Sequence, residues 1–134
     1  MLGLDTNVIL RLLLADDPSQ KRRASKAIAR ARAAGTQIVL GLGVVLELER
    51  VLRSSAKMDK AQVLGIFRLL LESNDVQIEN EKVLEQAVHT YQNTSADFAE
   101  CLFLAQYQGM GCHTMLTFDT KAARIQGIEL VASE

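Results

Sequence analysis

Four acidic residues that could act together as ligands are spread along almost the whole chain. Asp5 and Asp119 each follow a short apolar segment that is typical of a buried strand, and Glu47 lies beside the apolar stripe of a predicted helix. Asp97 and Glu100 are three residues apart at the start of another predicted helix, so they share one face of its first turn. Two carboxylates about 4 Å apart repel by ~4 kcal/mol at an effective dielectric of ~20. Such a set must take up protons or hold a divalent cation.

Oxygen ligands of this kind favour Mg²⁺ or Mn²⁺ over zinc. No lysine or arginine lies within four residues of Asp5 or Asp97 to neutralise them. A bound cation lowers the pKa of a water molecule and stabilises charge on phosphate oxygens, which is the chemistry of phosphodiester hydrolysis. Thr6, Asn7 and Thr117 are small polar neighbours of the acids, and we expect them to hold a carboxylate or a water in position.

Each candidate also has a purely structural interpretation. Asp5 and Asp119 stand where they could cap the helices that follow, and "TSAD" fits a capping box with Thr94 as the N-cap. Ordinary turn and cap chemistry accounts equally well for Asn7. The set of acids as a whole favours the metal-site interpretation, because each member lies where a parallel sheet would bring it to one edge.

The two glutamates of "VVLELERVLR" are expected to differ. Glu49 has Arg53 four residues later, which predicts an ordinary ion pair on the surface. Glu47 has Val44 before it and Val51 after it, so we expect it to point inward or along the edge of the sheet. An inward carboxylate without a basic partner is costly and needs a metal or a strong hydrogen-bond donor.

The elements that position these residues alternate between short apolar strands and amphipathic helices. This alternation predicts an α/β fold with a parallel sheet covered on both faces. No linker or internal repeat interrupts it, so we expect a single domain over residues 1–134. The predicted strands are 1–4, 36–40, 76–79, 114–118 and 128–131, and the predicted helices are 18–34, 43–55, 59–73, 80–93 and 94–111, with a short helix and turn over 119–127.

Composition narrows the class of protein. Hydrophobic residues make up 49% of the chain, and the formal net charge of −1 argues against a protein that coats nucleic acid nonspecifically. The longest uncharged apolar stretch, 38–46, is far shorter than the roughly 20 residues of a membrane helix. We therefore expect a soluble, cytoplasmic protein without membrane contact. Cys101 and Cys112 match no zinc spacing and are expected to be reduced thiols in the core.

Four segments of the chain resemble the PIN-domain ribonucleases, most closely the VapC-like toxins of type II toxin–antitoxin pairs. In order they are "LDTNVIL", "VVLELERVLR", "SADFAECLFLAQYQG" and "LTFDTKAAR". The resemblance implies a three-layer α/β/α sandwich with a central mostly parallel sheet, an acidic pocket for Mg²⁺ or Mn²⁺, and endonucleolytic cleavage of RNA. It also implies a homodimer and a cognate antitoxin protein whose C-terminal tail lies across the active-site groove.

Carried over residue by residue, the family's acids fall on Asp5, Glu47, Asp97 and Asp119, with its hydroxyl at Thr117. Glu100 stands where the family often has aspartate in a "DFxD" pattern. Its extra methylene keeps the charge but moves it, so Glu100 is a further candidate ligand rather than a member of the principal set.

Basic side chains gather between Lys21 and Arg32, where the chain has six of them and no acid. Arg22, Lys26 and Arg30 share one helical face and are candidates for binding RNA phosphates, although such a run is also typical of a solvated helix face. Arg11 interrupts an apolar run and could reach the surface or the substrate.

Two other functions remain open on the sequence alone. The chain could be a catalytically silent PIN-like module that only binds a partner or RNA, although the presence of all four acids favours catalysis. It could instead be an aspartyl phosphotransfer protein. Against this, the predicted strand 76–79 ends without an acceptor aspartate, and Asp5 is not followed two residues later by a second aspartate.

Overall fold

The computed structural model describes residues 1–134 and has a mixed α/β fold with parallel strands, as the sequence predicts. These elements are consistent with the three-layer α/β/α sandwich that the resemblance implies. The chain divides into two compact units, Met1–Glu79 and Asn80–Glu134, and each is described by itself. The assignment of residues 1–134 to a single domain stays a prediction.

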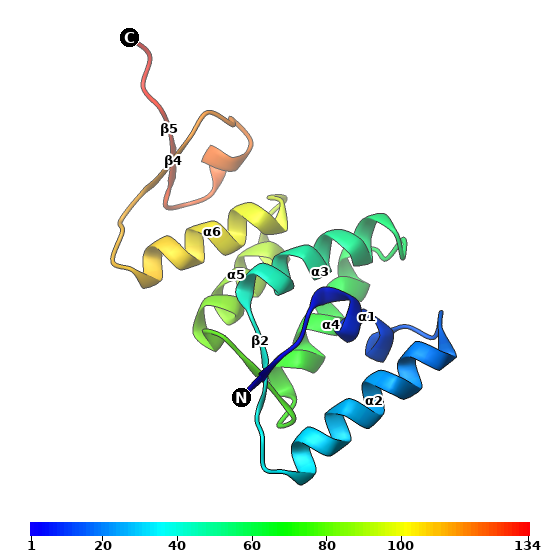
Figure 1. Ribbon diagram of the computed structural model, residues 1–134. Helices are drawn as coiled ribbons and strands as arrows, with labels where there is room; N and C mark the ends of the chain where they lie inside the picture. Colours follow the sequence, from blue (N-terminus) through cyan, green and yellow to red (C-terminus); the bar gives the residue numbers. More distant parts are fainter. The chain divides into compact units, whose positions relative to one another are not determined.

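The first unit contains a three-stranded parallel sheet with the order β1-β2-β3 (Figure 1). Leu2 pairs with Ile38, which in turn pairs with Val76 on the other side. Ile38 and Leu40 of the central strand are almost completely buried. The strands are β1 (Leu2–Gly3), β2 (Ile38–Leu40) and β3 (Val76–Ile78).

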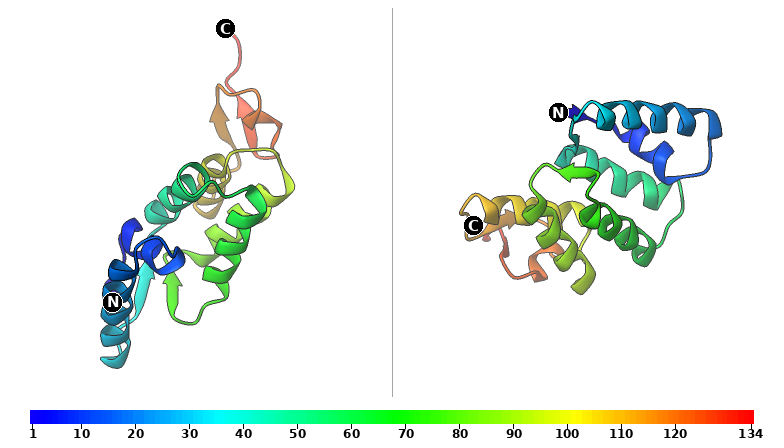
Figure 2. Two further views of the ribbon diagram at one scale, coloured as in Figure 1. Left: turned by 90° about the vertical axis from the view of Figure 1, so that its right-hand side faces the viewer. Right: turned by 90° about the horizontal axis from the view of Figure 1, so that it is seen from below.

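Four helices accompany this sheet, and three of them begin at aspartate caps. The side chains of Asp5, Asp17 and Asp59 each accept a hydrogen bond from a backbone N–H in the first turn of the following helix. α1 packs against α2 and α3, and α4 packs against α3 and β3 (Figure 2). The helices are α1 (Thr6–Leu13), α2 (Pro18–Ala33), α3 (Leu42–Ser54) and α4 (Lys60–Glu72).

The second unit contains a pair of packed helices and a two-stranded parallel sheet, β4-β5. Tyr91 and Phe98 hold the helices together through an edge-to-face contact, with their ring centroids 5.5 Å apart. Thr117 at the end of β4 pairs with Leu130 of β5. The elements are α5 (Glu81–Asn93), α6 (Phe98–Gly109), β4 (Met115–Thr117), a 3₁₀ helix η1 (Ala122–Arg124) and β5 (Ile128–Leu130).

Two details differ from the sequence predictions. α6 begins at Phe98 with Asp97 as its N-cap, so the prediction that Thr94 caps this helix is wrong. The Thr94 hydroxyl instead donates to the carbonyl of Thr90, which makes Thr94 the C-cap of α5. Cys101 is buried as expected, but Cys112 is exposed because it follows the turn at Gly111, which has a positive φ of 93°.

The longest helix is α2, with 16 residues, and it is strongly charged. No helix of the chain combines the length and the apolar character that crossing a membrane requires.

Candidate functional site

Asp5 lies two residues after the end of β1 and caps α1. Its Oδ1 accepts a hydrogen bond from the backbone N–H of Thr6 at 2.8 Å, and its side chain is exposed. Oδ2 makes no hydrogen bond. The cap interpretation of Asp5 is therefore correct, and it leaves one carboxylate oxygen free to bind a ligand.

Thr6 carries the one buried side-chain polar atom in the structure that has no hydrogen-bond partner. The residue is 2% exposed, and Oγ1 is the atom in question. Leaving a buried hydroxyl unsatisfied costs about 1–3 kcal/mol, so such an atom usually bonds to water or to a ligand. Thr6 thus offers an unused polar group next to Asp5 in the sequence.

The expected roles of the two α3 glutamates are reversed in the structure. Glu49 is 4% exposed, whereas Glu47 is exposed and makes no ion pair. The predicted pair between Glu49 and Arg53 is present, with Nε donating to Oε2 at 2.9 Å, but it is not a surface pair because the carboxylate is buried.

The reason for this reversal is the position of the buried stripe on α3. It runs through Val45, Leu48, Glu49 and Leu52, which are spaced as neighbours on one helical face. Arg53 neutralises the one acid on that face. Glu47 lies outside the stripe and is exposed to solvent.

Glu79 is an acid at the edge of the sheet that the sequence analysis did not single out. It follows β3, and its Oε1 accepts a hydrogen bond from the backbone N–H of Leu42 at 2.8 Å. Leu42 begins α3 after Gly41, which has no side chain with which to cap the helix. The missing cap at Gly41 is a local signal, but the contact joins residues far apart in the chain, so no local pattern could identify Glu79.

Glu100 lies near two other acidic residues of the second unit, Asp97 and Asp119. The backbone N–H of Asp97 donates to Oε2 of Glu100 at 3.3 Å, and Asp119 lies close enough to Glu100 to influence its pKa. Burial raises the pKa of Glu100 above its usual value, and the negative charges of Asp97 and Asp119 raise it further, against a lowering effect of the Asp97 backbone hydrogen bond. These surroundings therefore favour the protonated form of Glu100 more than water does.

Asp119 is held in place by its own loop. Its backbone N–H donates to Oγ1 of Thr117 at 3.0 Å, and its Oδ1 accepts from the backbone N–H of Lys121 at 2.8 Å. These bonds fix the loop between β4 and η1 and use Oδ1 as a cap. Thr117 thus positions the backbone of Asp119 at the end of β4.

The family model of the PIN domain matches residues 3–128 of the chain. The chain belongs to the PIN-domain family. The PIN domain is a nuclease-type fold, and PIN nucleases typically use divalent metal ions and act on nucleic acid. The matched range includes Asp5, Glu47, Asp97 and Asp119. A search of curated proteins finds no match to the chain.

The donor set of this PIN domain suits a divalent metal in its chemistry. Asp97, Glu100 and Asp119 supply only carboxylate oxygens, which are the donors that Mg²⁺ and Mn²⁺ prefer. The pKa of Glu100 is raised first by burial and then by the negative charges of Asp97 and Asp119. No group of three or more histidine, cysteine or acidic side chains has the arrangement to hold a metal ion by itself.

The basic candidates of the PIN domain lie on α1 and α2. Arg11 is already engaged, because its Nη1 donates to Asp16 at 2.9 Å and its Nε donates to Gln20 at 2.6 Å. Arg22, Lys26 and Arg30 are exposed on α2 and make no ion pair. A hollow of about 330 Å³ lies between the two helices and is lined by Asn7, Val8, Arg11, Gln20, Arg23, Ala24 and Ala27.

Proposed function

We propose that the chain is a metal-dependent endoribonuclease that hydrolyses RNA phosphodiester bonds with Mg²⁺ or Mn²⁺. The observation that carries the proposal is the PIN-domain match over residues 3–128, a range that includes every acid of the candidate set. The influence of Asp97 and Asp119 on Glu100 supports it, because neighbouring carboxylates are stabilised by a cation.

In this proposal Asp5, Glu47, Asp97 and Asp119 hold the cation, with Glu100 as a further candidate. The bound cation would supply positive charge that acidifies an attacking water and stabilises the phosphate oxygens. Asp5 is suited to this role because its Oδ2 is free. Thr6, Asn7 and Thr117 orient the carboxylates, and Thr117 already fixes the backbone of Asp119.

The cellular part of the proposal rests on the resemblance of the four sequence segments. We propose that the protein is the toxin of a toxin–antitoxin pair, acts in the cytoplasm as a homodimer, and is inhibited by a cognate antitoxin. A small reading frame for a DNA-binding antitoxin directly beside the gene is the expected genetic signature, and measurement of the molar mass in solution tests the dimer.

RNA cleavage by the purified full-length chain tests the enzymatic proposal. We expect cleavage of structured RNA with Mg²⁺ or Mn²⁺, loss of cleavage with a chelator, and recovery when metal is added back. Asp5→Asn and Asp119→Asn should each abolish cleavage, since an amide cannot replace the negative charge of a metal ligand.

Glu85→Gln is the matched control for these variants. Glu85 is exposed on α5 and makes no ion pair, so its neutralisation changes the net charge by the same amount without touching the candidate site. RNA binding without any metal-dependent cleavage would overturn the proposal in favour of a silent binding module. A hydroxylamine-labile phosphoryl adduct on Asp5 would overturn it in favour of phosphotransfer.

A further inference from the structure

α2 is a long helix that buries nothing. None of its 16 residues is buried, although it packs against α1 and β2. Asp17 at the cap and Pro18 in the first turn start the helix, while its small apolar side chains, such as Ala24 and Ile28, are only partly covered. A helix of this kind contributes little to the hydrophobic core. Core packing therefore does not constrain its side chains, which are available for binding at the surface.

The surface of α2 carries an unusual excess of positive charge. Six basic residues and no acid lie on the helix, and only Arg32 is neutralised, by Asp75 at 2.7 Å. The remaining five have neither an ion pair nor a side-chain hydrogen bond in the structure, namely Lys21, Arg22, Arg23, Lys26 and Arg30. Like charges spaced four residues apart destabilise a helix by about 0.2–0.5 kcal/mol for each pair. A bound polyanion would relieve this repulsion.

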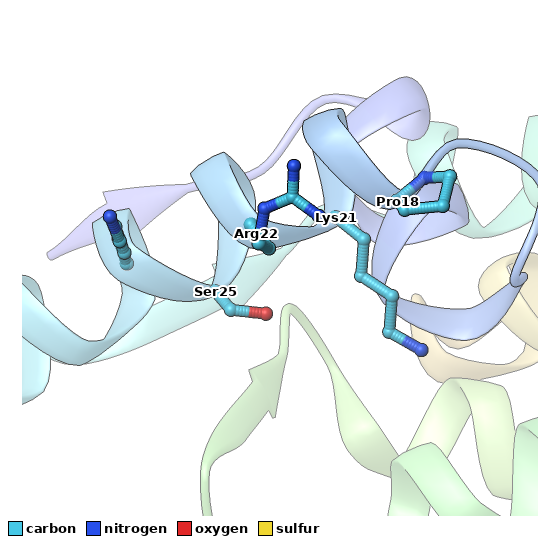
Figure 3. A pocket seen from close by; sticks show the side chains of 5 residues that line it. Pro18, Lys21, Arg22 and Ser25 are labelled. Atoms are coloured by element: carbon cyan, nitrogen blue, oxygen red, sulfur yellow. The ribbon is translucent and has the colours of Figure 1, made fainter.

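Part of this charge surrounds a hollow. A depression of about 450 Å³ is lined by Pro18, Lys21, Arg22, Ser25 and Lys26. Figure 3 shows Lys21, Arg22 and Ser25 projecting from α2 around it, with Pro18 in the first turn of the helix. The lining combines ammonium and guanidinium groups with one hydroxyl and contains no acid, which is the donor set that binds phosphate oxygens.

We propose that this hollow, with the basic face that continues from Lys26 to Arg30, binds backbone phosphates of the RNA that the enzyme cleaves. The inference rests on the proposed function for the identity of the polyanion. Arg22, Lys26 and Arg30 are spaced along roughly 12 Å of the helix, at 1.5 Å per residue, so they match a chain of phosphates better than a single anion. Contacts of this kind position a nucleic acid without reading its sequence.

The distribution of charge in the sequence agrees with this assignment. Residues 1–79 contain twelve of the fifteen basic residues and nine of the sixteen acids, so they are net positive, whereas residues 80–134 are net negative. The overall net charge of −1 is therefore the sum of a positive charge on the first unit and a negative charge on the second.

Binding of a short fluorescein-labelled oligouridylate, followed by anisotropy in chelator over a series of salt concentrations, tests the inference without cleavage. The test variant is Lys21→Gln/Arg22→Gln/Lys26→Gln. The matched control is Arg50→Gln/Lys57→Gln/Lys82→Gln, which removes three exposed positive charges elsewhere. For a single strand each phosphate contact contributes ~0.7 to the slope of log K against log [salt], so the test variant should lower the slope by about 2. The control should keep the wild-type slope.

The inference is overturned if the test variant binds like the wild type, if the control loses as much as the test variant, or if polyglutamate competes as well as RNA at equal charge. Should the triple variant fail to fold, Lys26→Gln alone should lower the slope by about 0.7. Wild-type protein that binds RNA as expected but never cleaves it would contradict the proposed function and leave the inference standing. Cleavage with an unchanged KM in the test variant would contradict only the inference.

Discussion

Glu100 on α6 lies close enough to Asp119, which follows β4, for the negative charge of Asp119 to raise the pKa of Glu100. Burial raises the pKa of Glu100, the backbone hydrogen bond from Asp97 lowers it, and the negative charges of Asp97 and Asp119 raise it further. The raised pKa therefore links the stability of the second unit to pH.

We expect Glu100→Gln to stabilise the metal-free protein at neutral pH by no more than about 1 kcal/mol, because the cluster is partly exposed to solvent. Folding raises the pKa of Glu100 above 4.5, so its favourable contribution is complete below pH 4.5 and is lost as the pH rises through the folded-state pKa. Glutamine stays neutral and can still accept the bond from Asp97. Denaturant unfolding in chelator should show no advantage of the variant at low pH and a growing advantage above pH 4.5. An equal profile for Glu85→Gln would contradict the prediction.

The cap role and the proposed ligand role of Asp5 can be separated by two substitutions. Asparagine caps helices as well as aspartate does, whereas alanine at an N-cap costs about 0.5–2 kcal/mol. We therefore expect Asp5→Asn to keep the wild-type free energy of unfolding and to abolish metal-dependent RNA cleavage. Asp5→Ala should lose both. Normal RNA cleavage by Asp5→Asn would mean that Asp5 only caps α1 and is not a metal ligand.

Local patterns predicted the elements better than they predicted which side chains are buried. Asp17, Pro18 and Gly35 mark the ends of α2 through short-range backbone chemistry, and the structure confirms all three. The burial of Glu49 could not be predicted in the same way, because it depends on which face of α3 meets the rest of the first unit. An apolar stripe seen from the sequence alone can be rotated by one residue, and this exchanges Glu47 and Glu49.

The same limit applies to the candidate site. The sequence placed Asp97 and Glu100 on one helical turn, and the structure confirms that they are in contact. The proximity of Glu100 to Asp119 joins two segments far apart in the chain, so it depends on the tertiary fold. The role of Glu79 could not be predicted for the same reason, because its partner is the backbone N–H of Leu42 at the start of α3.

The buried ion pair on α3 predicts an asymmetric effect of its two substitutions. Arg53→Met keeps much of the aliphatic stem but leaves the Glu49 carboxylate, which is 4% exposed, without its cationic partner. We expect this variant to lose about 1–3 kcal/mol in the free energy of unfolding. Glu49→Gln removes the charge and should cost less.

A double-mutant cycle measured by denaturant unfolding checks this pair. The double variant should be more stable than the sum of the single effects predicts, since the unpaired charge is absent once both residues are changed. Additive effects, or a larger loss for Glu49→Gln than for Arg53→Met, would contradict the assignment of Glu49 as a buried charge that Arg53 neutralises.

Thr6→Val replaces the unpartnered hydroxyl with a methyl group of similar size. Because Oγ1 has no hydrogen-bond partner within the protein, this substitution removes a buried polar atom and sacrifices no protein contact. We expect the free energy of unfolding to stay equal or to rise by up to about 1–3 kcal/mol in metal-free buffer. RNA cleavage should fall, because under the proposed function the hydroxyl orients a carboxylate or a water beside Asp5.

Thr6→Ser, which keeps the hydroxyl and loses the methyl, should show the opposite pattern, with lower stability and retained cleavage. A Thr6→Val protein that is both less stable and fully active would mean that the hydroxyl serves the fold through a bound water.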